Sequence, residues 1–498
     1  MARRLGRFRP LPDLSPPAAP PARRSRAAPP PAAPSLGSAP LSDARLWLPA
    51  GASHLRPRAG GEFVLYWIQV TQRAHDNFAL EYAIEQADEL GVPVLAYFSL
   101  RPDYPWASDR FHTFMLEGVI DMAAGFAKKG IQFAHFLDQR VQGDGVDHHA
   151  NLKALSARAS LVVTDWFPTF IMPRQLKQLR EAIDAPVVAV DSATVVPAQS
   201  LEKAFSGARH IRPVLMKDLD SWLQPVPNST PRHTTPVSLP FEPTIVTEER
   251  IAELVAGCPI DHSVAPARGW RGGSVAARTR LDWFAEHGLP RYLERNDPNV
   301  DATSKLSPWL HFGHVSVHEM LLTAKSEGPS EQYDKFLDET LTWRELAFNL
   351  CRFEPRHRTM AAVPEWAQKE LADHSDDPRT LYRDDELEFA RTDNELWNAA
   401  QRSYLRDGWM HNYMRMLWGK SIIGWTENPE RALRLLEHLN NKYSLDGRDP
   451  NSYGGILWCF GKFDRPFYRR PVFGTVRYMS LKAASGKFDV ERYIQSMA

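Results

Sequence analysis

The sequence predicts an α/β N-terminal domain with a Rossmann-like, parallel, five-stranded sheet, followed by an all-α domain. Short β-branched or aromatic runs alternate with longer amphipathic stretches up to about residue 200, a pattern typical of βαβ units. Beyond about Glu248 the strand signal ends and the sequence favours helices throughout. A chain of 498 residues also exceeds the size that one hydrophobic core usually supports.

The individual elements follow from the apolar pattern in chain order. Strands are predicted over residues 62–69, 92–99, 131–137, 160–164 and 186–190, because each run is almost continuously apolar, as in strands buried on both faces. Helices are predicted between them over residues 73–90, 111–129, 151–158 and 173–183. In the second half, helices are predicted over residues 331–351, 394–405, 410–423 and 429–439.

Composition divides the chain further. Residues 1–58 are predicted to be a disordered tail rich in Pro, Ala and Arg, since the first forty residues hold eleven prolines, seven arginines and one acid, Asp13. Organelle targeting by this tail is the alternative, but a transit peptide would be amphipathic and richer in Ser. We expect the α/β domain over residues 59–200, a Pro-rich linker over 201–247 and the helical domain over 248–498.

Several classes of protein are disfavoured. The 60 basic and 60 acidic residues balance, so the chain is not a globally basic nucleic-acid binder. Its three cysteines are far apart, which argues against disulfides, a zinc site or an iron–sulfur cluster. No apolar run is long enough to span a membrane, and neither a GxGxxG nor a GxxxxGK[ST] motif is present. We expect a monomer without metal or obligate protein partner, in the cytoplasm or associated with DNA.

The helical half carries the sharper signals. Ten of the fifteen tryptophans lie there, and residues 401–498 hold sixteen Lys/Arg against nine acids; a solvated surface and a phosphate-contacting face are both possible readings. TSKLSPWLHFG at residues 303–313 suits a phosphate at a helix start or a simple helix cap. Glu339 and Trp343 share one helical face. KYSLDGRDPNSYGGILW at residues 442–458 could bind the polar edge of a flavin or merely brace its loop.

These strings, in this order, resemble the class II cyclobutane pyrimidine dimer photolyases of the photolyase/cryptochrome superfamily. The resemblance covers residues 60–495 and includes VLYWIQVTQRAHDNFAL, RHIRP and RNDPN. It implies an antenna-type α/β domain and a helical domain that binds FAD, with UV-damaged DNA as the partner. It also implies a carbon–carbon lyase activity, in which photoexcited reduced FAD donates an electron to a flipped-out dimer and splits it.

The resemblance also assigns residues to roles. The expected FAD ligands are Tyr292, Thr303, Ser304, Lys305, Leu306, Ser307, Asn440, Asp446, Arg448 and Asp449. The expected catalytic and dimer-contacting residues are Glu339, Trp343, Met416, Trp458 and Asn440. Of these, Asn440 would face flavin N5. The expected electron-transfer residues are Trp418, Trp397, Trp425, Tyr382 and Arg415, and the expected DNA-binding residues are Arg465, Phe467 and Arg477.

Two departures from the family pattern concern DNA and pigment binding. Phe467 stands where relatives typically have Trp, which predicts a small loss of stacking. VTQRAHDNF differs from the usual charged form of this string, so the antenna chromophore, of deazaflavin or folate type, stays open.

Three alternatives to dimer repair remain at this point. They are a cryptochrome-like flavin photoreceptor without repair activity, a helical nucleic-acid-binding module without photochemistry, and a lyase for 6-4 photoproducts. The grouping of Glu339, Trp343, Met416 and Trp458 argues against the photoreceptor, because these residues form one substrate constellation.

Overall fold

The computed structural model describes residues 43–49, 52, 55–141, 143 and 145–498. Residues 40–498 form one compact unit. Most of the predicted tail, residues 1–42, lies outside the described residues. Within the described ranges, no helix is long and apolar enough to cross a membrane.

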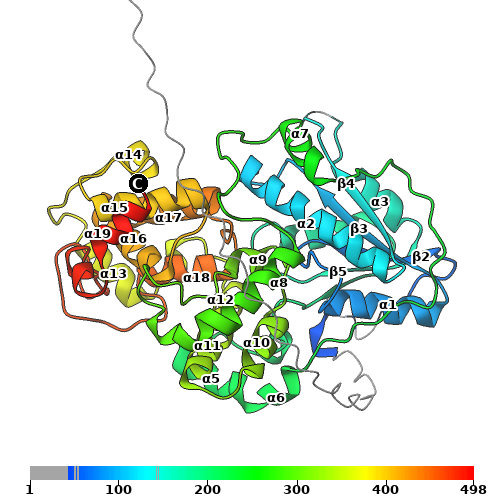
Figure 1. The fold of residues 1–498 in the computed structure, drawn as a ribbon, viewed down its shortest axis with the longest axis horizontal. Helices are drawn as coiled ribbons and strands as arrows, with labels where there is room; N and C mark the ends of the chain where they lie inside the picture. The colour runs from blue at the N-terminus through cyan, green and yellow to red at the C-terminus, as the bar shows by residue number, and fades with distance from the viewer. Residues whose placement is uncertain (1–42, 50–51, 53–54, 142, 144) are drawn as a thin grey trace, which may run out of the picture. The chain divides into compact units, whose positions relative to one another are not determined.

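A six-stranded sheet forms the α/β part (Figure 1), with the strand order β1-β6-β5-β2-β3-β4. Its strands are β1 (Leu46–Trp47), β2 (Phe63–Ile68), β3 (Val94–Leu100), β4 (Gln132–Leu137), β5 (Ala159–Asp165) and β6 (Val187–Val190). The five predicted strands are β2 to β6, and all neighbours among them are parallel. The predicted strand number was one too low, because β1 adds an antiparallel edge strand beside β6.

The predicted tail was also too long, because residues 43–49 belong to the fold. The side chain of Arg45, 2% exposed, donates hydrogen bonds to the carbonyl oxygens of Asp191, Thr194 and Val195 at 2.8–3.0 Å. Trp47 stacks on Trp166 with ring centroids 4.5 Å apart. These long-range contacts bury a short segment whose position beside a Pro-rich stretch does not predict that it is part of the fold.

Four helices alternate with the parallel strands: α1 (Phe78–Leu90), α2 (Asp109–Lys128), α3 (Ala150–Ser156) and α4 (Met172–Ala182). Helix α1 begins five residues later than predicted, because the side chain of Asn77 accepts a hydrogen bond from the Leu80 amide and so caps it. Ahead of it, the buried guanidinium of Arg73 donates to the carbonyl oxygens of Asp76 and Gly313. This loop therefore ties the sheet to the helical half.

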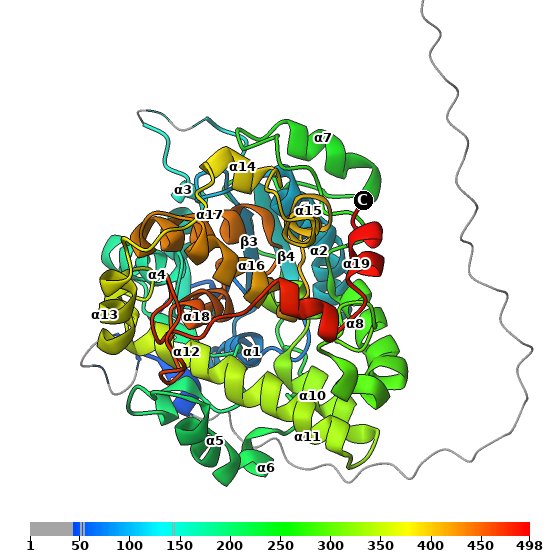
Figure 2. The same cartoon turned by 90° about the vertical axis from the view of Figure 1, so that its left-hand side faces the viewer.

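From Glu248 onward the described chain is helical, as predicted, and no named strand follows β6 among the described residues. Two helices, Ala208–Lys217 and Leu219–Trp222, also lie within the range 201–247 that we expected to be a linker. The helices are α5 (Ala208–Lys217), α6 (Leu219–Trp222), α7 (Ile251–Ala256), α8 (Ser274–Trp283), α9 (Ser307–His311), α10 (Val317–Ser326), α11 (Glu331–Leu337), α12 (Arg344–Phe353), α13 (Glu365–Asp373), α14 (Asp384–Glu388), α15 (Glu395–Asp407), α16 (Asn412–Gly424), α17 (Pro429–Tyr443), α18 (Pro450–Cys459) and α19 (Val490–Ser496). Figure 2 shows α11 and α12 as one long rod, joined by a π-helical turn at Asp338–Trp343.

The Pro-rich segment that we expected to connect the two parts is packed against the sheet. The amide of Val237 donates to Gln132 of β4 at 2.6 Å, and the amide of Thr244 donates to the carbonyl of His135 at 2.8 Å. This segment therefore covers the outer edge of β4, where unpaired backbone groups would otherwise be exposed.

Candidate active site

The predicted phosphate-binding segment, residues 303–307, leads into α9 and is held in place by Arg280. The guanidinium of Arg280 donates to the carbonyl oxygens of Thr303 and Ser304 at 2.7 and 2.8 Å. Lys305 adopts a left-handed backbone conformation (φ 55°), and its ammonium lies 3.1 Å from Asp301. Leu306 is fully buried. Arg280 and these local contacts fix the path of the segment before any ligand is considered.

Two polar groups of this region fit a ligand rich in oxygen atoms. Among the described residues, Oγ1 of Thr303 and Nε of Arg415 are buried without a hydrogen-bond partner. Buried polar atoms rarely stay unpaired, so such groups suit a ligand that carries phosphates and hydroxyls. The Ser307 hydroxyl instead accepts from the indole Nε1 of Trp409 at 3.3 Å.

The loop before α18 holds a buried ion pair. Nη2 of Arg415 lies 3.1 Å from both carboxylate oxygens of Asp446, and the Ser444 hydroxyl donates to Asp446 at 2.5 Å. Burial acts to raise the pKa of the Asp446 carboxyl, but Arg415 and the hydroxyls of Ser307 and Ser444 hold it below its usual range. The structure thus joins Arg415, which we expected beside the electron path, to the predicted FAD group.

Arg448 packs on aromatic rings of the α/β part. Its guanidinium carbon lies 3.6 Å from the ring centroid of Phe111 in the α/β part, and its Nη2 lies 3.5 Å from Nε2 of His311. Asp449 caps α18 and places a carboxylate oxygen 3.4 Å from Nδ1 of the same histidine. Three residues of this loop were predicted to meet the flavin edge. One of them, Arg448, lines a different pocket, which is described below.

An aromatic line runs from Asn440 to the protein surface. Asn440 is 2% exposed and accepts a 3.2 Å hydrogen bond from the hydroxyl of Tyr404. The ring of Tyr404 packs edge-to-face on Trp418 at 5.4 Å. Gln401 accepts a hydrogen bond from the Trp418 indole at 2.8 Å and so fixes that ring. Sequence reasoning missed Tyr404 and Gln401, since both are ordinary buried residues of α15 and approach Asn440 and Trp418 only in the fold.

The predicted electron-transfer residues continue this line. The indole Nε1 of Trp397 donates to the carbonyl oxygen of Trp418 at 3.1 Å, and its ring lies 5.4 Å from that of Trp425. Tyr382 lies 5.2 Å beyond Trp425. Trp397 and Trp418 are buried, whereas Trp425 and Tyr382 are half-buried, so the line connects the interior with solvent.

Glu339 lies in a small cluster of charged and aromatic residues on the π-helical turn. Its carboxylate lies 2.7 Å from Nζ of Lys335 and 3.5 Å from Nη2 of Arg295. Burial and the Glu339 carboxylate raise the pKa of Tyr292 above its usual range, and the Arg295 guanidinium lies 5.5 Å from the Tyr292 ring. The structure thus joins Glu339 to Tyr292, and adds Lys335 and Arg295, which sequence reasoning missed.

The three aromatic and thioether residues expected to contact the dimer pack on two different hydrophobic cores. Trp343 packs on the core that includes the sheet, whereas Met416 and Trp458 pack on the core of the C-terminal helices. All three are half-buried.

The expected DNA-binding residues form a ladder of alternating cations and rings. The guanidinium of Arg477 lies 4.5 Å from the ring of Phe467 and 5.2 Å from that of Trp458. The guanidinium of Arg465 lies 5.6 Å from the Phe467 ring, and the ammonium of Lys420 lies 5.1 Å from the Trp458 ring. This arrangement joins the predicted DNA-binding residues to Trp458 of the predicted dimer site.

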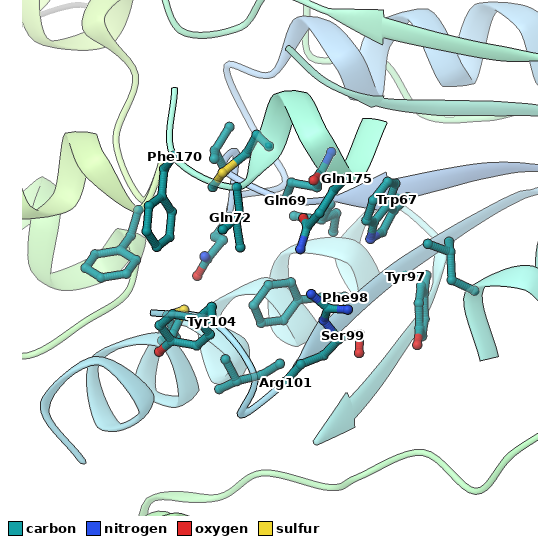
Figure 3. Close-up of a pocket in the computed structure, with 18 of the residues that line it drawn as sticks. Trp67, Gln69, Gln72, Tyr97, Phe98, Ser99, Arg101, Tyr104, Phe170 and Gln175 are labelled. Atoms are coloured by element: carbon teal, nitrogen blue, oxygen red, sulfur yellow. The ribbon is translucent and has the colours of Figure 1, made fainter. Parts of the chain in front are cut away.

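A second pocket lies at the carboxyl ends of the parallel strands (Figure 3). Residues from β2, β3 and the segment before α4 line it, and Arg448 and Phe312 close it from the helical half. The loops after β2 and β5 leave the sheet in opposite directions, and open α/β sheets bind ligands at such a point. Oε1 of Gln69 and Nε2 of His148 are buried there without a partner among the described residues.

Comparisons with known proteins agree with this architecture. The family model for DNA photolyase matches residues 64–231. A deoxyribodipyrimidine photo-lyase of Methanothermobacter thermautotrophicus is 35% identical over 441 residues, which cover 88% of this chain and 95% of that protein. A bacterial class III photolyase from Agrobacterium tumefaciens superposes with a TM-score of 0.64 at 19% identity, covering 90% of this chain and 88% of that one. A Synechocystis cryptochrome superposes with a TM-score of 0.62 at 17% identity, covering 87% and 88%. The two solved structures support the fold.

Proposed function

The chain belongs to the DNA photolyase family, and from this premise we propose that it is a class II enzyme that splits cyclobutane pyrimidine dimers in UV-damaged DNA under blue light. The observation that carries the proposal is the meeting of three groups around α16 to α18: the Arg415–Asp446 pair, the aromatic line that starts at Asn440 and the Trp458–Arg477–Phe467 ladder. A cofactor site, an electron path and a DNA-contacting surface are what light-driven repair requires.

FAD, when bound and reduced, would supply the photoexcited electron. Different residues would bind different parts of FAD. The segment at residues 303–307 would bind its phosphates, and Asp446 and Arg415 would bind its polar edge. Asn440 offers an amide rather than a carboxylate, and a neutral group there does not repel an anionic reduced ring.

The remaining residues would act on the DNA. The ladder of Arg465, Phe467 and Arg477 would bind phosphates and stack on bases beside the extruded dimer. Trp343, Met416 and Trp458 would line the dimer pocket. The carboxyl O–H of Glu339 would donate a hydrogen bond to the negative charge that develops on the dimer. That role requires Glu339 to hold or share a proton when the dimer is bound.

The pocket of Figure 3 would hold a second, light-harvesting pigment of the deazaflavin or folate class. The partnerless acceptor of Gln69 and the nitrogen of His148 would bind the polar edge of its ring, and Arg448 would lie between this pigment and the loop of Asp446.

The test is direct. The purified protein should show flavin absorbance, and it should restore dimer-containing DNA only when it is reduced and illuminated. A flavin-containing protein that leaves dimers intact under light would instead favour a photoreceptor, and repair of 6-4 photoproducts alone would exclude the class II assignment.

A further inference from the structure

A cavity of about 500 Å³ opens beside Trp425, at the outer part of the aromatic line. We call it the Trp425 pocket. Its walls come from the second half of α16, with Trp425 just after it, and from residues within 470–482. A cavity of this volume is in the range that accommodates small organic ligands.

The lining of the Trp425 pocket carries three cations, Lys420, Arg470 and Lys482, and no Asp or Glu among the residues described there. Arg470 and Lys482 are exposed, and no ion pair to a carboxylate is found for either within residues 145–498. Lys420 is fully buried and donates to the carbonyl oxygen of Cys459 at 2.7 Å. The two exposed cations at this acid-free cavity, Arg470 and Lys482, favour an anionic ligand, whereas the Lys420 ammonium is already bound to a backbone carbonyl.

The remaining walls are aromatic or apolar. Phe473 and Tyr478 pack edge-to-face at 5.1 Å, and the guanidinium of Arg470 lies 5.5 Å from the Tyr478 ring. Trp425 contributes its own side chain to the lining and lies 5.4 Å from Trp397. A ligand in this cavity would therefore lie next to the aromatic line, with planar side chains available for stacking.

We propose that the Trp425 pocket binds a small organic anion with an oxidisable conjugated ring, of the dihydronicotinamide nucleotide class, which serves as the electron donor to the aromatic line. The inference rests on the proposed function. In a first photoreduction event the ligand gives up one electron and releases a proton to water, and in a second event it gives up its other electron and becomes the oxidised nicotinamide. Each electron passes inward through Trp425, Trp397 and Trp418 to the light-excited flavin. Over the two events the flavin takes up both electrons and one proton from solvent. The bound donor restores each indole to its starting state.

The first test is binding in the dark, with reduced nicotinamide mononucleotide as the probe and titration calorimetry as the readout. The wild-type holoprotein should bind it saturably, and added salt should weaken the binding. The exposed pair Arg470→Glu/Lys482→Glu should raise the Kd about tenfold or more. Lys487→Glu, an exposed charge reversal outside the lining, should leave the Kd unchanged.

The second test is photoreduction with two donors. The double variant should slow flavin photoreduction by the nucleotide but not by dithiothreitol, which is uncharged at neutral pH. Absence of saturable binding to the wild type, or equal Kd values in the wild type and the double variant, would overturn the proposal. If the double variant changes only the affinity for undamaged duplex DNA, the cations serve the DNA backbone and the proposal is wrong. Because binding is measured in the dark, its failure is separable from a failure of repair.

Discussion

The hydroxyl of Tyr404 donates a 3.2 Å hydrogen bond to Oδ1 of Asn440, and both side chains are buried. Nδ2 of Asn440 in turn donates to Asn441 at 3.1 Å. The amide that we propose to face the flavin is therefore held by its neighbours on α15 and α17. The same tyrosine ring contacts Trp418, so one residue joins the proposed flavin side of the site to the proposed electron path.

Replacing Asn440 by Asp should lower the reduction potential of the bound flavin. A buried carboxylate at this place would repel the anionic reduced ring, and about 60 mV of potential corresponds to each tenfold change in a one-electron equilibrium constant. The measurement is spectroelectrochemical titration of the holoprotein. Tyr404→Phe, which frees Asn440 without adding charge, should shift the potential much less; equal shifts in the two variants would contradict an electrostatic role.

Replacing Trp418 or Trp397 by Phe should block photoreduction of the oxidised flavin, because phenylalanine is far harder to oxidise than tryptophan. Repair by protein that has been chemically reduced beforehand should be unchanged. Transient absorption and a repair assay under anaerobic conditions give the two readouts. Normal photoreduction in both variants would show that electrons enter by another route.

The contrast between the predicted and the observed elements has a physical basis. The parallel strands were predictable because burial on both faces requires nearly continuous apolar runs, such as FVLYWI of β2. The edge strand β1 was not, since its two residues depend on the contacts of Arg45 with a loop about 150 residues away. Among candidate site residues, motifs identified Asp446 and Thr303, but only the fold brings Tyr404 to Asn440 and directs Arg448 toward Phe111.

Replacing Glu339 by Ala should lower the quantum yield of repair by roughly tenfold while FAD stays bound, because the developing charge on the dimer loses a hydrogen-bond donor. Glu339→Gln should retain more activity, since an amide also donates. The measurement is repair per absorbed photon with prereduced protein. Glu331→Ala, on the exposed start of α11, is the matched control and should match the wild type. Undiminished repair in Glu339→Ala would refute the role.

Replacing Phe467 by Trp should tighten binding to dimer-containing DNA about threefold, since a larger ring stacks better on bases and on the neighbouring guanidinium groups. The existing contacts of Phe467 with Arg477 at 4.5 Å and Arg465 at 5.6 Å place it for such stacking. Fluorescence anisotropy with a damaged duplex measures the affinity. Arg477→Ala should weaken binding in either background, and a weaker Phe467→Trp complex would place this ring outside the DNA interface.

Glu345 of α12 should make the stability of the fold depend on pH. It is 1% exposed, and its carboxyl accepts hydrogen bonds from the amides of Val195 and Val196 in the loop after β6. Burial raises the pKa of Glu345 to about 8, against an ordinary value of 4.5. Between these two values the folded protein binds more protons at this group than the unfolded chain does, so the free energy of unfolding falls as pH rises. The full effect is on the order of 5 kcal/mol.

The variant Glu345→Gln isolates this contribution, because an amide oxygen can accept from the same two backbone amides but does not titrate. Urea unfolding of both holoproteins at pH 5, 6.5 and 8 gives the measurement. The wild type should lose stability relative to the variant as pH rises through this window. A constant difference would mean that the Glu345 carboxyl is already ionised in the folded protein at pH 5, stabilised by Arg344 or by water. The contact between α12 and the loop after β6 would then be hydrated or charge-paired.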